Sequence, residues 1–585
     1  MKSFGYRRRT FWTRNRKRIV IGYIVLSAVV LLGGYFVLRK SGDPTLQLPN
    51  QPLIVELPGY GKFRGTKVVK NKKNVLLDEP VDAWLGIEYS TQPVGEKRFG
   101  IPDWPEPFNG TKSATEYGKA CMQNWGWNPK WHTEACLTFN VYRPPGIPFD
   151  TKLPVFVFFH GGSFVVGDGR SLDGATFVSK SKEPLMVVTA QYRLGALGSF
   201  PSKLFEEEGL LNLGMRDQRQ LLEFLQKYLT NFGGDSGRVT LGGQSAGAHA
   251  VGLHLFHDYG ETEGKKLFSQ AIIASGAPTA RSFPSPTYPL YERYYNDFMT
   301  DVQCPIKVNS TNAETLQCLR AVPMSKFRLA SGKLYTASNY NITWPWQPNF
   351  SGPVIEKSGS QSGIDGTFFK IPLLISSVTD EGKMFAPRDL ETNTDFIDFM
   401  ANLLPGLTSD DLAELEKLYP DPSDGEGPYT DYGGRFVSTQ FERISAAYGD
   451  YSYICPVQET AHRLAVAGAP VYKARFNTPN GAPACMCVPH ASDHGYFNGH
   501  TNVEYPDIAE IYHSYYASFV ISGDPNTYKS PKAPKWDRYW KVGSGQLAVG
   551  NTARGGVVME EERKGIRMRE CAWWRDEARM KRLNK

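Results

Sequence analysis

Short apolar runs separated by polar turns recur along this chain, and several have the length of a buried β-strand. They cover residues 53–57, 153–159, 373–375 and 471–476. Upstream of a further β-rich run that starts at residue 239, six apolar residues fall on one helical face: Met215, Leu221, Leu222, Leu225, Leu229 and Phe232. Gly233-Gly234-Asp235 then ends this helix, and residues 512–520 look helical as well. Strands that alternate with helices predict an α/β fold.

A candidate nucleophile follows the β-rich run. Gly243-Gln244-Ser245-Ala246-Gly247 has the G-x-S-x-G pattern, in which a serine occupies a strained turn between a strand and a helix. Glycine at the two flanking positions lets the strand and the helix approach closely. Five residues alone also fit an ordinary glycine-rich turn. The preceding helix and strand favour a nucleophile elbow with Ser245 as the nucleophile, because this order of elements resembles that of the α/β-hydrolases.

Composition and charge narrow the function classes. The chain has 585 residues, of which 41% are hydrophobic, 13% aromatic and 21% charged, so it can build a large packed core. Residues 1–18 contain eight Lys and Arg and no acid, so the formal net charge of +7 leaves −1 for the remainder. The basic excess is local, which gives no reason to expect nucleic-acid binding by the main body.

The N-terminal region has the pattern of a membrane anchor. Residues 19–38 carry no charge and are followed by Arg39 and Lys40, and a helix of about 20 residues crosses a bilayer. A cleaved signal peptide, the alternative, would have a shorter apolar core and a small-residue cleavage site. The basic residues before the span favour a cytoplasmic N-terminus. We therefore expect a tail (1–18), a signal-anchor helix (19–38), a linker (39–51) and a lumenal or extracellular domain (52–585), which would be secreted if the span were cleaved.

Several motifs occur in the order of a known family. Of the family's opening pattern this chain retains Gly86, Ile87, Tyr89, Pro93, Gly95, Arg98 and Phe99. Further matches to the family's motifs are Cys121-Met122-Gln123, Tyr192-Arg193-Leu194-Gly195, Asp217-Gln218 and Gly523-Asp524-Pro525-Asn526. With these motifs the chain resembles the type B carboxylesterase/lipase family from about residue 52 to residue 575. The resemblance implies an α/β-hydrolase fold: one domain with long insertions and a large, mostly parallel sheet flanked by helices.

The apolar run 153–159 ends in His160-Gly161-Gly162-Ser163-Phe164, an H-G-G-type turn. Such a turn can aim backbone N–H groups at a developing oxyanion, although by itself it also fits an ordinary glycine turn. Aligned on the family, the oxyanion donors would be Gly162 and Ser163, together with Ala246, the residue after the nucleophile.

The acid and the base of a triad are expected further along the chain. Asp380 and Glu381 follow the run 373–375, and the family motif D-E-G-x-x-F implies that Glu381 is the acid, the alternative being a solvated acidic loop. After residues 471–476, His490-Ala491-Ser492-Asp493 matches the family's H-x-x-E/D pattern, whereas His494-Gly495 matches a shorter variant. We favour His490 as the general base and expect His494 and His500 at the surface.

The eight cysteines suit an oxidising compartment. The resemblance implies disulfides between Cys121 and Cys136 and between Cys304 and Cys318, against the alternative of buried thiols. We expect Cys455 to pair with Cys485 or Cys487, and the spacing between Cys485 and Cys487 is too short for a zinc knuckle. Glycosylation sequons at Asn109, Asn309, Asn341 and Asn349 agree with this compartment.

The predicted activity is serine carboxylic-ester hydrolysis through Ser245, His490 and Glu381 and an acyl-enzyme, which requires no metal and no organic cofactor. The substrate would be a small-molecule or lipid ester. Gln244 replaces the family's usual glutamate, which argues against a cholinesterase. Two alternatives are an adhesion ectodomain of the neuroligin kind, which an intact triad disfavours, and an acyltransferase that uses the same triad. The acyl-chain preference and the oligomeric state are left open.

Overall fold

The computed structural model describes residues 53–124, 128, 130–256, 267–304, 310–425, 427–429, 437–479 and 486–585. Within these ranges Leu53–Lys585 forms one unit. The predicted tail, anchor helix and linker lie outside the described residues. Among the helices that are described, none combines the length and the apolar character needed to cross a bilayer.

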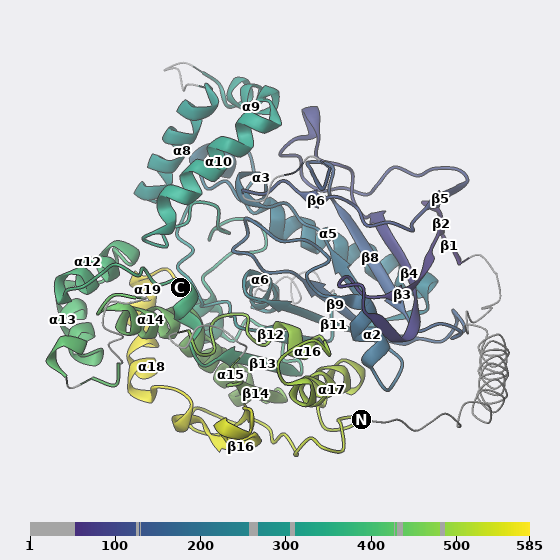
Figure 1. Cartoon of the computed structure of the whole chain (residues 1–585). Coiled ribbons are helices and arrows are strands. Elements are labelled where there is room, and N and C mark those ends of the chain that lie inside the picture. The colour runs from purple at the N-terminus through teal and green to yellow at the C-terminus, as the bar shows by residue number, and fades with distance from the viewer. Residues whose placement is uncertain are drawn as a thin grey trace, which may run out of the picture. The chain divides into compact units, whose positions relative to one another are not determined.

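A large mixed sheet forms the centre of this unit (Figure 1). Its strand order is β16-β15-β14-β13-β12-β11-β9-β10-β8-β4-β3, and the strands from β15 to β10 pair in parallel. The parallel strands are β9 (Leu153–Phe159), β10 (Met186–Ala190), β11 (Gly234–Gln244), β12 (Gln270–Ala274), β13 (Leu373–Val378), β14 (Val471–Phe476) and β15 (Gly545–Val549). Antiparallel strands complete the two edges: β3 (Thr66–Lys70), β4 (Leu76–Glu88), β8 (Thr138–Arg143) and β16 (Val557–Glu561).

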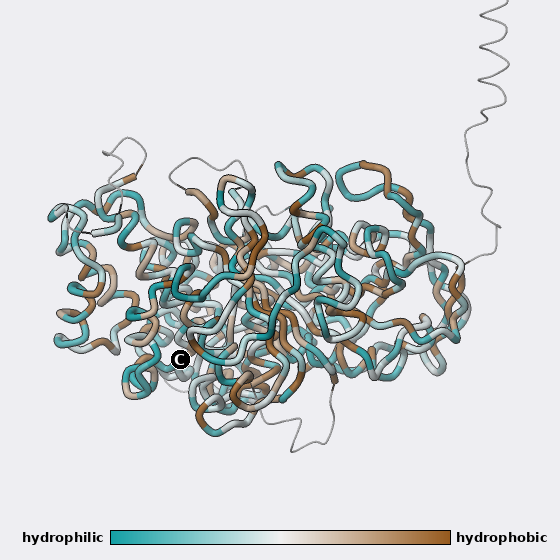
Figure 2. The backbone as a smooth tube through the Cα atoms, turned by 90° about the horizontal axis from the view of Figure 1, so that it is seen from below, coloured by the Kyte–Doolittle hydropathy of each residue, from teal (hydrophilic) through white to brown (hydrophobic). Residues whose placement is uncertain are grey.

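Helices cover both faces of the sheet, and alternate residues of β9 show this directly. Val155 and Val157 belong to the same core as α5 (Leu213–Tyr228), α6 (Ala246–Leu255) and α15 (Cys455–Val466), whereas Phe156 and Phe158 pack with α2 (Gly174–Lys180) and α17 (Pro506–Ser522). Successive side chains of a strand point to opposite faces, so a strand buried on both sides reads as a continuous apolar run. Figure 2 shows the hydrophobic stretches concentrated toward the interior.

The predicted runs 153–159 and 471–476 form β9 and β14 with the expected bounds, and the run 373–375 extends to β13 (Leu373–Val378). The run 53–57 forms β1 (Ile54–Leu57), but β1 belongs to a separate three-stranded sheet with β2 (Gly61–Arg64) and β5 (Thr111–Ser113). The turn that ends the predicted helix is shorter than expected, because Gly233 alone takes a left-handed conformation and β11 begins at the next residue. The helix predicted over residues 512–520 extends to Pro506–Ser522.

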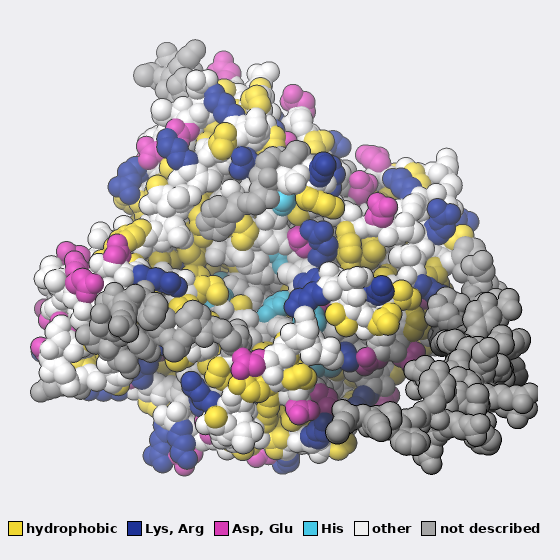
Figure 3. Space-filling view, viewed as in Figure 1, with side chains coloured by type: hydrophobic (Ala, Val, Ile, Leu, Met, Phe, Trp, Pro, Cys, Tyr) yellow, Lys and Arg dark blue, Asp and Glu magenta, His cyan; other side chains and the backbone are white. Residues whose placement is uncertain are grey.

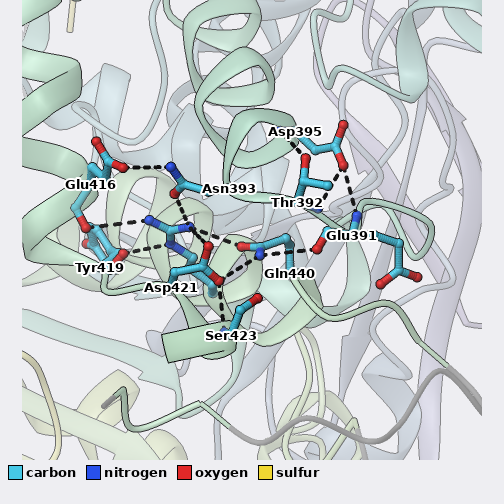
Figure 4. A network of polar contacts seen from close by, with 10 residues as sticks. Glu391, Thr392, Asn393, Asp395, Glu416, Tyr419, Asp421, Ser423 and Gln440 are labelled. Carbon is cyan, nitrogen blue, oxygen red and sulfur yellow. Dashed lines mark hydrogen bonds and ion pairs between the residues drawn. The ribbon is translucent and has the colours of Figure 1, made fainter. Parts of the chain in front are cut away.

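Two groups of helices from the insertions pack in a second core beside the sheet. They are α8 (Pro289–Val302), α9 (Asn312–Ala321) and α10 (Met324–Asn339), and α12 (Asn393–Leu403), α13 (Ser409–Leu418) and α14 (Phe441–Gly449). In the second group, the buried Arg443 donates to the carbonyl oxygen of Tyr419 at 2.6 Å and to Oδ1 of Asn393 at 2.8 Å. Figure 4 shows this polar network, which ties the three helices together.

Three disulfides join described residues: Cys121–Cys136, Cys304–Cys318 and Cys455–Cys571. The first two are the pairs that the resemblance implied. The tentative pairing of Cys455 with Cys485 or Cys487 is wrong, because α18 (Met568–Trp574) returns the chain to the start of α15.

The four sequons also differ in accessibility. Asn349 is fully buried, so a glycan has no access to it in the folded chain. Asn109 is exposed, Asn341 is half-buried, and Asn309 lies outside the described residues.

Candidate active site

Ser245 occupies the turn between β11 and α6, with φ 58° and ψ −127°. A positive φ in this region is strained for a residue with a side chain and costs about 1–3 kcal/mol. Its two flanking glycines have no room for a side chain. A Cβ at Gly243 would lie 2.3 Å from the carbonyl carbon of Gly247, and a Cβ at Gly247 would lie 2.0 Å from the carbonyl oxygen of Phe159. The packing of strand against helix therefore holds the turn at the carboxyl end of β11.

Three side chains from separate segments meet at this edge of the sheet. The Nε2 atom of His490 lies 2.7 Å from Oγ of Ser245, and its Nδ1 atom lies 2.5 Å from Oε2 of Glu381. The backbone N–H of Val378 donates a 2.8 Å hydrogen bond to Oε1 of the fully buried Glu381. Glu381 follows β13 and His490 follows β14, so parallel neighbouring strands deliver both side chains to the serine.

The adjacent carboxylate of Asp380 has a different partner. Its Oδ2 atom accepts a 3.1 Å hydrogen bond from the backbone N–H of Val488, and its own backbone N–H donates to the Val488 carbonyl oxygen at 3.0 Å. Lys383 Nζ lies 3.5 Å from Oδ1 of Asp380. Asp380 therefore fastens the segment before His490 to the end of β13, while the neighbouring Glu381 reaches the imidazole.

The other two histidines of the loop face other surroundings. His494 is half-buried, with its ring against Phe158 and Phe497. His500 is 5% exposed, and its Nε2 atom lies 4.0 Å from Oδ2 of Asp173, the N-cap of α2. The expectation that both lie at the surface is wrong for His500, because the loop folds back onto α2. Burial lowers the pKa of His500 to about 4, so this side chain is neutral near pH 7.

The turn after β9 lies against the elbow. Gly162 and Ser163 have φ values of 109° and 55°, and a Cβ added at Gly161 would lie 2.8 Å from Cβ of Ser245. No described residue accepts a hydrogen bond from the backbone N–H of Gly162 or Ser163. Ala246 is the first residue of α6, where N–H groups have no acceptor within the helix. Three N–H groups near the serine thus have no acceptor among the described residues.

Residues of the insertions support this turn. Gln347 Nε2 donates to the carbonyl oxygen of Ser163 at 3.0 Å, and the Gln347 carbonyl oxygen in turn accepts a hydrogen bond from the hydroxyl of Ser199. The Tyr335 hydroxyl hydrogen-bonds to the Ser163 side chain. The turn is therefore fixed from both its backbone and its side-chain side.

The histidine lies in an aromatic, largely buried environment. The ring centroid of His490 is 4.5 Å from that of Tyr453 and 5.2 Å from that of Phe385. The Nε2 atom of Gln244 lies 3.5 Å from the Nε2 atom of His490. Burial, and then the charges of Arg281 and His490, lowers the pKa of His249 well below its usual value, so this neighbouring imidazole is neutral. In Figure 3 histidine side chains come to the surface near the centre of the face shown.

Asp493 is a second buried carboxyl group near the candidate acid. It is fully buried, and no other described residue hydrogen-bonds to its side-chain oxygens. Burial, and then the charge of Glu381, raises the pKa of Asp493 to about 7. Within the described ranges, no group of three or more His, Cys, Asp and Glu side chains is arranged to hold a metal ion.

Residues 51–574 match the sequence model of the carboxylesterase family. The chain belongs to this family. This carboxylesterase is 46% identical over 534 residues to secreted lipase 4 of Gibberella zeae, which covers 91% of this chain and 95% of the relative. It is 28% identical over 528 residues to lipase 1 of Geotrichum candidum, covering 82% of this chain and 90% of the lipase.

The fold of this carboxylesterase is also similar to a solved structure. The crystal structure of Aspergillus niger EstA matches with a TM-score of 0.78 and 27% identity, covering 92% of this chain and all (100%) of that chain. The carboxylesterase therefore has the α/β-hydrolase fold and is a carboxylic ester hydrolase. Membership of this hydrolase family favours the enzyme over the adhesion alternative.

Several groups around the site carry no sequence signal that would have revealed them. Arg281, Tyr335, Gln347 and Tyr453 lie in insertions or connecting segments without a recognisable motif, and only the folded chain brings them next to the loops with Ser245 and His490.

Proposed function

We propose that this carboxylesterase hydrolyses esters through a Ser245-His490-Glu381 triad and a covalent acyl-enzyme. In the first step Oγ of Ser245 attacks the ester carbonyl carbon while Nε2 of His490 takes the hydroxyl proton. The negative charge that develops on the carbonyl oxygen faces the backbone N–H groups of Gly162, Ser163 and Ala246. Oxyanion donors of this kind contribute about 3 kcal/mol each. The Glu381 carboxylate stabilises the imidazolium.

The imidazolium then gives its proton to the alcohol oxygen as the ester C–O bond breaks, and the alcohol leaves. In the second step a water oxygen attacks the acyl carbon, and His490 accepts a proton from that water. Collapse of this second tetrahedral intermediate releases the acid and returns the proton to Oγ of Ser245. In each step a group must first accept a proton and then donate it. The imidazole of His490, between Ser245 and Glu381, suits both roles.

The observation that carries this proposal is the continuous hydrogen-bonded series from Ser245 Oγ through both ring nitrogens of His490 to the buried carboxylate of Glu381, at 2.7 and 2.5 Å. The strained elbow supports it, because the two glycine contacts fix the serine where it meets the imidazole.

The test combines covalent labelling with turnover. We expect a fluorophosphonate probe to label the native protein at Ser245, and Ser245→Ala to lose both labelling and p-nitrophenyl butyrate hydrolysis, by about 10⁴- to 10⁶-fold. Circular dichroism and thermal unfolding of the variant serve as folding controls. Near-normal turnover by Ser245→Ala, or labelling at another serine, would refute the proposed nucleophile.

We also propose that the catalytic domain faces the lumen or the exterior, held by residues 19–38 as a signal anchor. The uncharged span with its basic flank supports insertion, and the three disulfides suit an oxidising compartment. The word "secreted" in the name of the Gibberella zeae relative supports the same side of the membrane.

Two measurements test this placement. The protein should stay with membranes through carbonate extraction, and its catalytic domain should resist protease in intact vesicles. A mature N-terminus near residue 40 would show that the span is cleaved and the protein secreted. A catalytic domain that protease digests in sealed vesicles would refute its placement in the lumen or outside the cell.

A further inference from the structure

A cavity of about 230 Å³ lies among the helices of the insertions, and two arginines, Arg281 and Arg582, line it. Its walls come from α8, from the ends of α12 and α19 (Glu577–Arg582) and from the segment between α14 and α15. No Asp or Glu of the described chain is among its lining residues. The charged groups on this wall are therefore positive.

The two arginines differ in their partners. Arg582 forms an ion pair with Asp411, with Nη2 and Oδ2 at 2.5 Å. Arg281 is 8% exposed and donates to the hydroxyl of Tyr448 at 2.8 Å and to the hydroxyl of Tyr453. Its guanidinium carbon lies 4.0 Å from the ring centroid of Trp344.

These contacts leave the charge of Arg281 without a counter-ion. Two neutral phenols and an indole face are its partners, and it forms no ion pair with a described carboxylate within 4.0 Å. A guanidinium has five N–H donors and is always charged. A buried positive charge without a paired anion is costly, and a carboxylate fits its planar fork with two parallel hydrogen bonds.

Two side chains connect the surroundings of Arg281 with the candidate active site, and one of them lines the cavity. Gln347 lines it and also donates to the carbonyl oxygen of Ser163, on the turn beside the serine. Tyr453 accepts from Arg281, and its ring lies 4.5 Å from that of His490. Ser245, Glu381 and His490 are not among the lining residues of the cavity, so a substrate with its ester carbonyl at Ser245 reaches Arg281 only past the side chains of Gln347 and Tyr453.

We propose that Arg281 is a specificity-determining residue that binds a free carboxylate of the substrate, so that the preferred substrates are esters carrying a second, ionised acid group. This inference rests on the proposed function of the same site. The acid group belongs either to the acyl part, as in a monoester of a dicarboxylic acid, or to the alcohol part, as in an acylated hydroxy acid. Both present the same carboxylate to the guanidinium.

The test on the native protein compares matched ester pairs in a pH-stat at pH 7. Monomethyl glutarate is compared with methyl valerate for an acid on the acyl side, and O-butyryl glycolate with ethyl butyrate for an acid on the alcohol side. A charge-assisted contact predicts that kcat/KM of the acid member exceeds that of its neutral match by about 10- to 100-fold in one pair. The pair that shows the preference identifies the side of the ester.

Two variants assign the preference to the residue. Arg281→Met should bring the acid-to-neutral ratio of kcat/KM to about 1 or below, and Arg281→Lys should keep part of it, because charge without the fork gives one contact in place of two. Arg582→Met is the matched control, since it removes a charge from the same cavity that Asp411 already compensates, and the ratio should persist. The acid-to-neutral ratio of kcat/KM does not depend on the fraction of enzyme that is folded, so partial misfolding of a variant does not change it.

A native enzyme that hydrolyses the neutral esters but shows no acid preference in either pair would overturn this inference and leave the proposed function standing. Equal losses on acid and neutral esters in Arg281→Met would also overturn it, because Arg281 would then only support the packing of Trp344 and Tyr453. A native protein that hydrolyses none of the four esters would refute the proposed function and this inference with it.

Discussion

Replacement of Glu381 by glutamine tests the electrostatic role of the proposed acid without changing its size. The carboxylate accepts from Nδ1 of His490 at 2.5 Å and from the backbone N–H of Val378 at 2.8 Å, and it is fully buried. A glutamine can keep the second contact through its carbonyl oxygen. Its NH₂ group, however, would face Nδ1 and favour the wrong imidazole tautomer, and it offers no charge to the imidazolium.

The size of the effect follows from the buried ion pair that forms in the transition state. Two unit charges about 4 Å apart interact by about 4 kcal/mol at an effective dielectric constant of 20. This corresponds to a loss of roughly 10³-fold in kcat. Loss of the correct tautomer adds to it, so we expect Glu381→Gln to reduce kcat for p-nitrophenyl butyrate at pH 7 by about 10³- to 10⁴-fold, with a small change in KM.

Asp380→Asn is the matched control, because it removes the neighbouring carboxylate charge and keeps an oxygen for the backbone N–H of Val488. We expect it to lose less than about tenfold, since this position does not contact the imidazole. Stopped-flow or steady-state release of p-nitrophenol measures both variants. A nearly inactive Asp380→Asn beside an active Glu381→Gln would refute the assignment of the acid.

Three further predictions concern the base, a disulfide and a buried acid. His490→Ala should be as inactive toward p-nitrophenyl butyrate as a serine knockout, whereas His494→Ala should keep activity within about tenfold, and the opposite result would move the base. Replacing Cys455 and Cys571 by alanine opens a loop with a sequence separation of 116 and should lower the free energy of unfolding, measured in urea, by about 4–5 kcal/mol; an unchanged midpoint would contradict this. Asp493→Asn should flatten the pH dependence of that free energy between about pH 4 and pH 7, and an unaltered pH profile would contradict the burial argument.

Much of the geometry of the candidate active site could be predicted from sequence, because it depends on local rules. The G-x-S-x-G turn around Ser245 and the D-E-G turn at Glu381 both follow short apolar strands, and carboxyl ends of parallel strands meet at one edge. His490 was harder, since three histidines share one loop and only the fold decides which of them reaches the serine.

Other features depend on contacts between distant segments and leave no local pattern. The Cys455–Cys571 pair requires that α18 return to α15, across a separation of 116 in sequence. The sequence predicts that His500 lies at the surface, yet it is buried because its loop folds onto α2. Arg281 lies in a segment with no motif, and its importance comes from the aromatic insertions that fold over it.

Asp493 and Glu381 are two buried carboxyl groups whose hydrogen-bond partners differ. Both are fully buried, but Glu381 accepts hydrogen bonds from His490 and from the backbone N–H of Val378, whereas Asp493 accepts none from another described residue. Burial and the charge of Glu381 raise the pKa of Asp493 from 3.8 to about 7. Two adjacent charges in a buried site are unfavourable, so Asp493, which accepts no hydrogen bond from another described residue, is the carboxyl group that holds the proton.

This arrangement sets the sign of the pH dependence. The folded chain holds a proton on Asp493 that the unfolded chain has already released above about pH 4, so the contribution of this group to stability is present at low pH. It is lost as the pH rises toward about 7, by up to about 4 kcal/mol in the limit of an isolated site. At pH values below about 7 a protonated Asp493 therefore adds no negative charge beside Glu381.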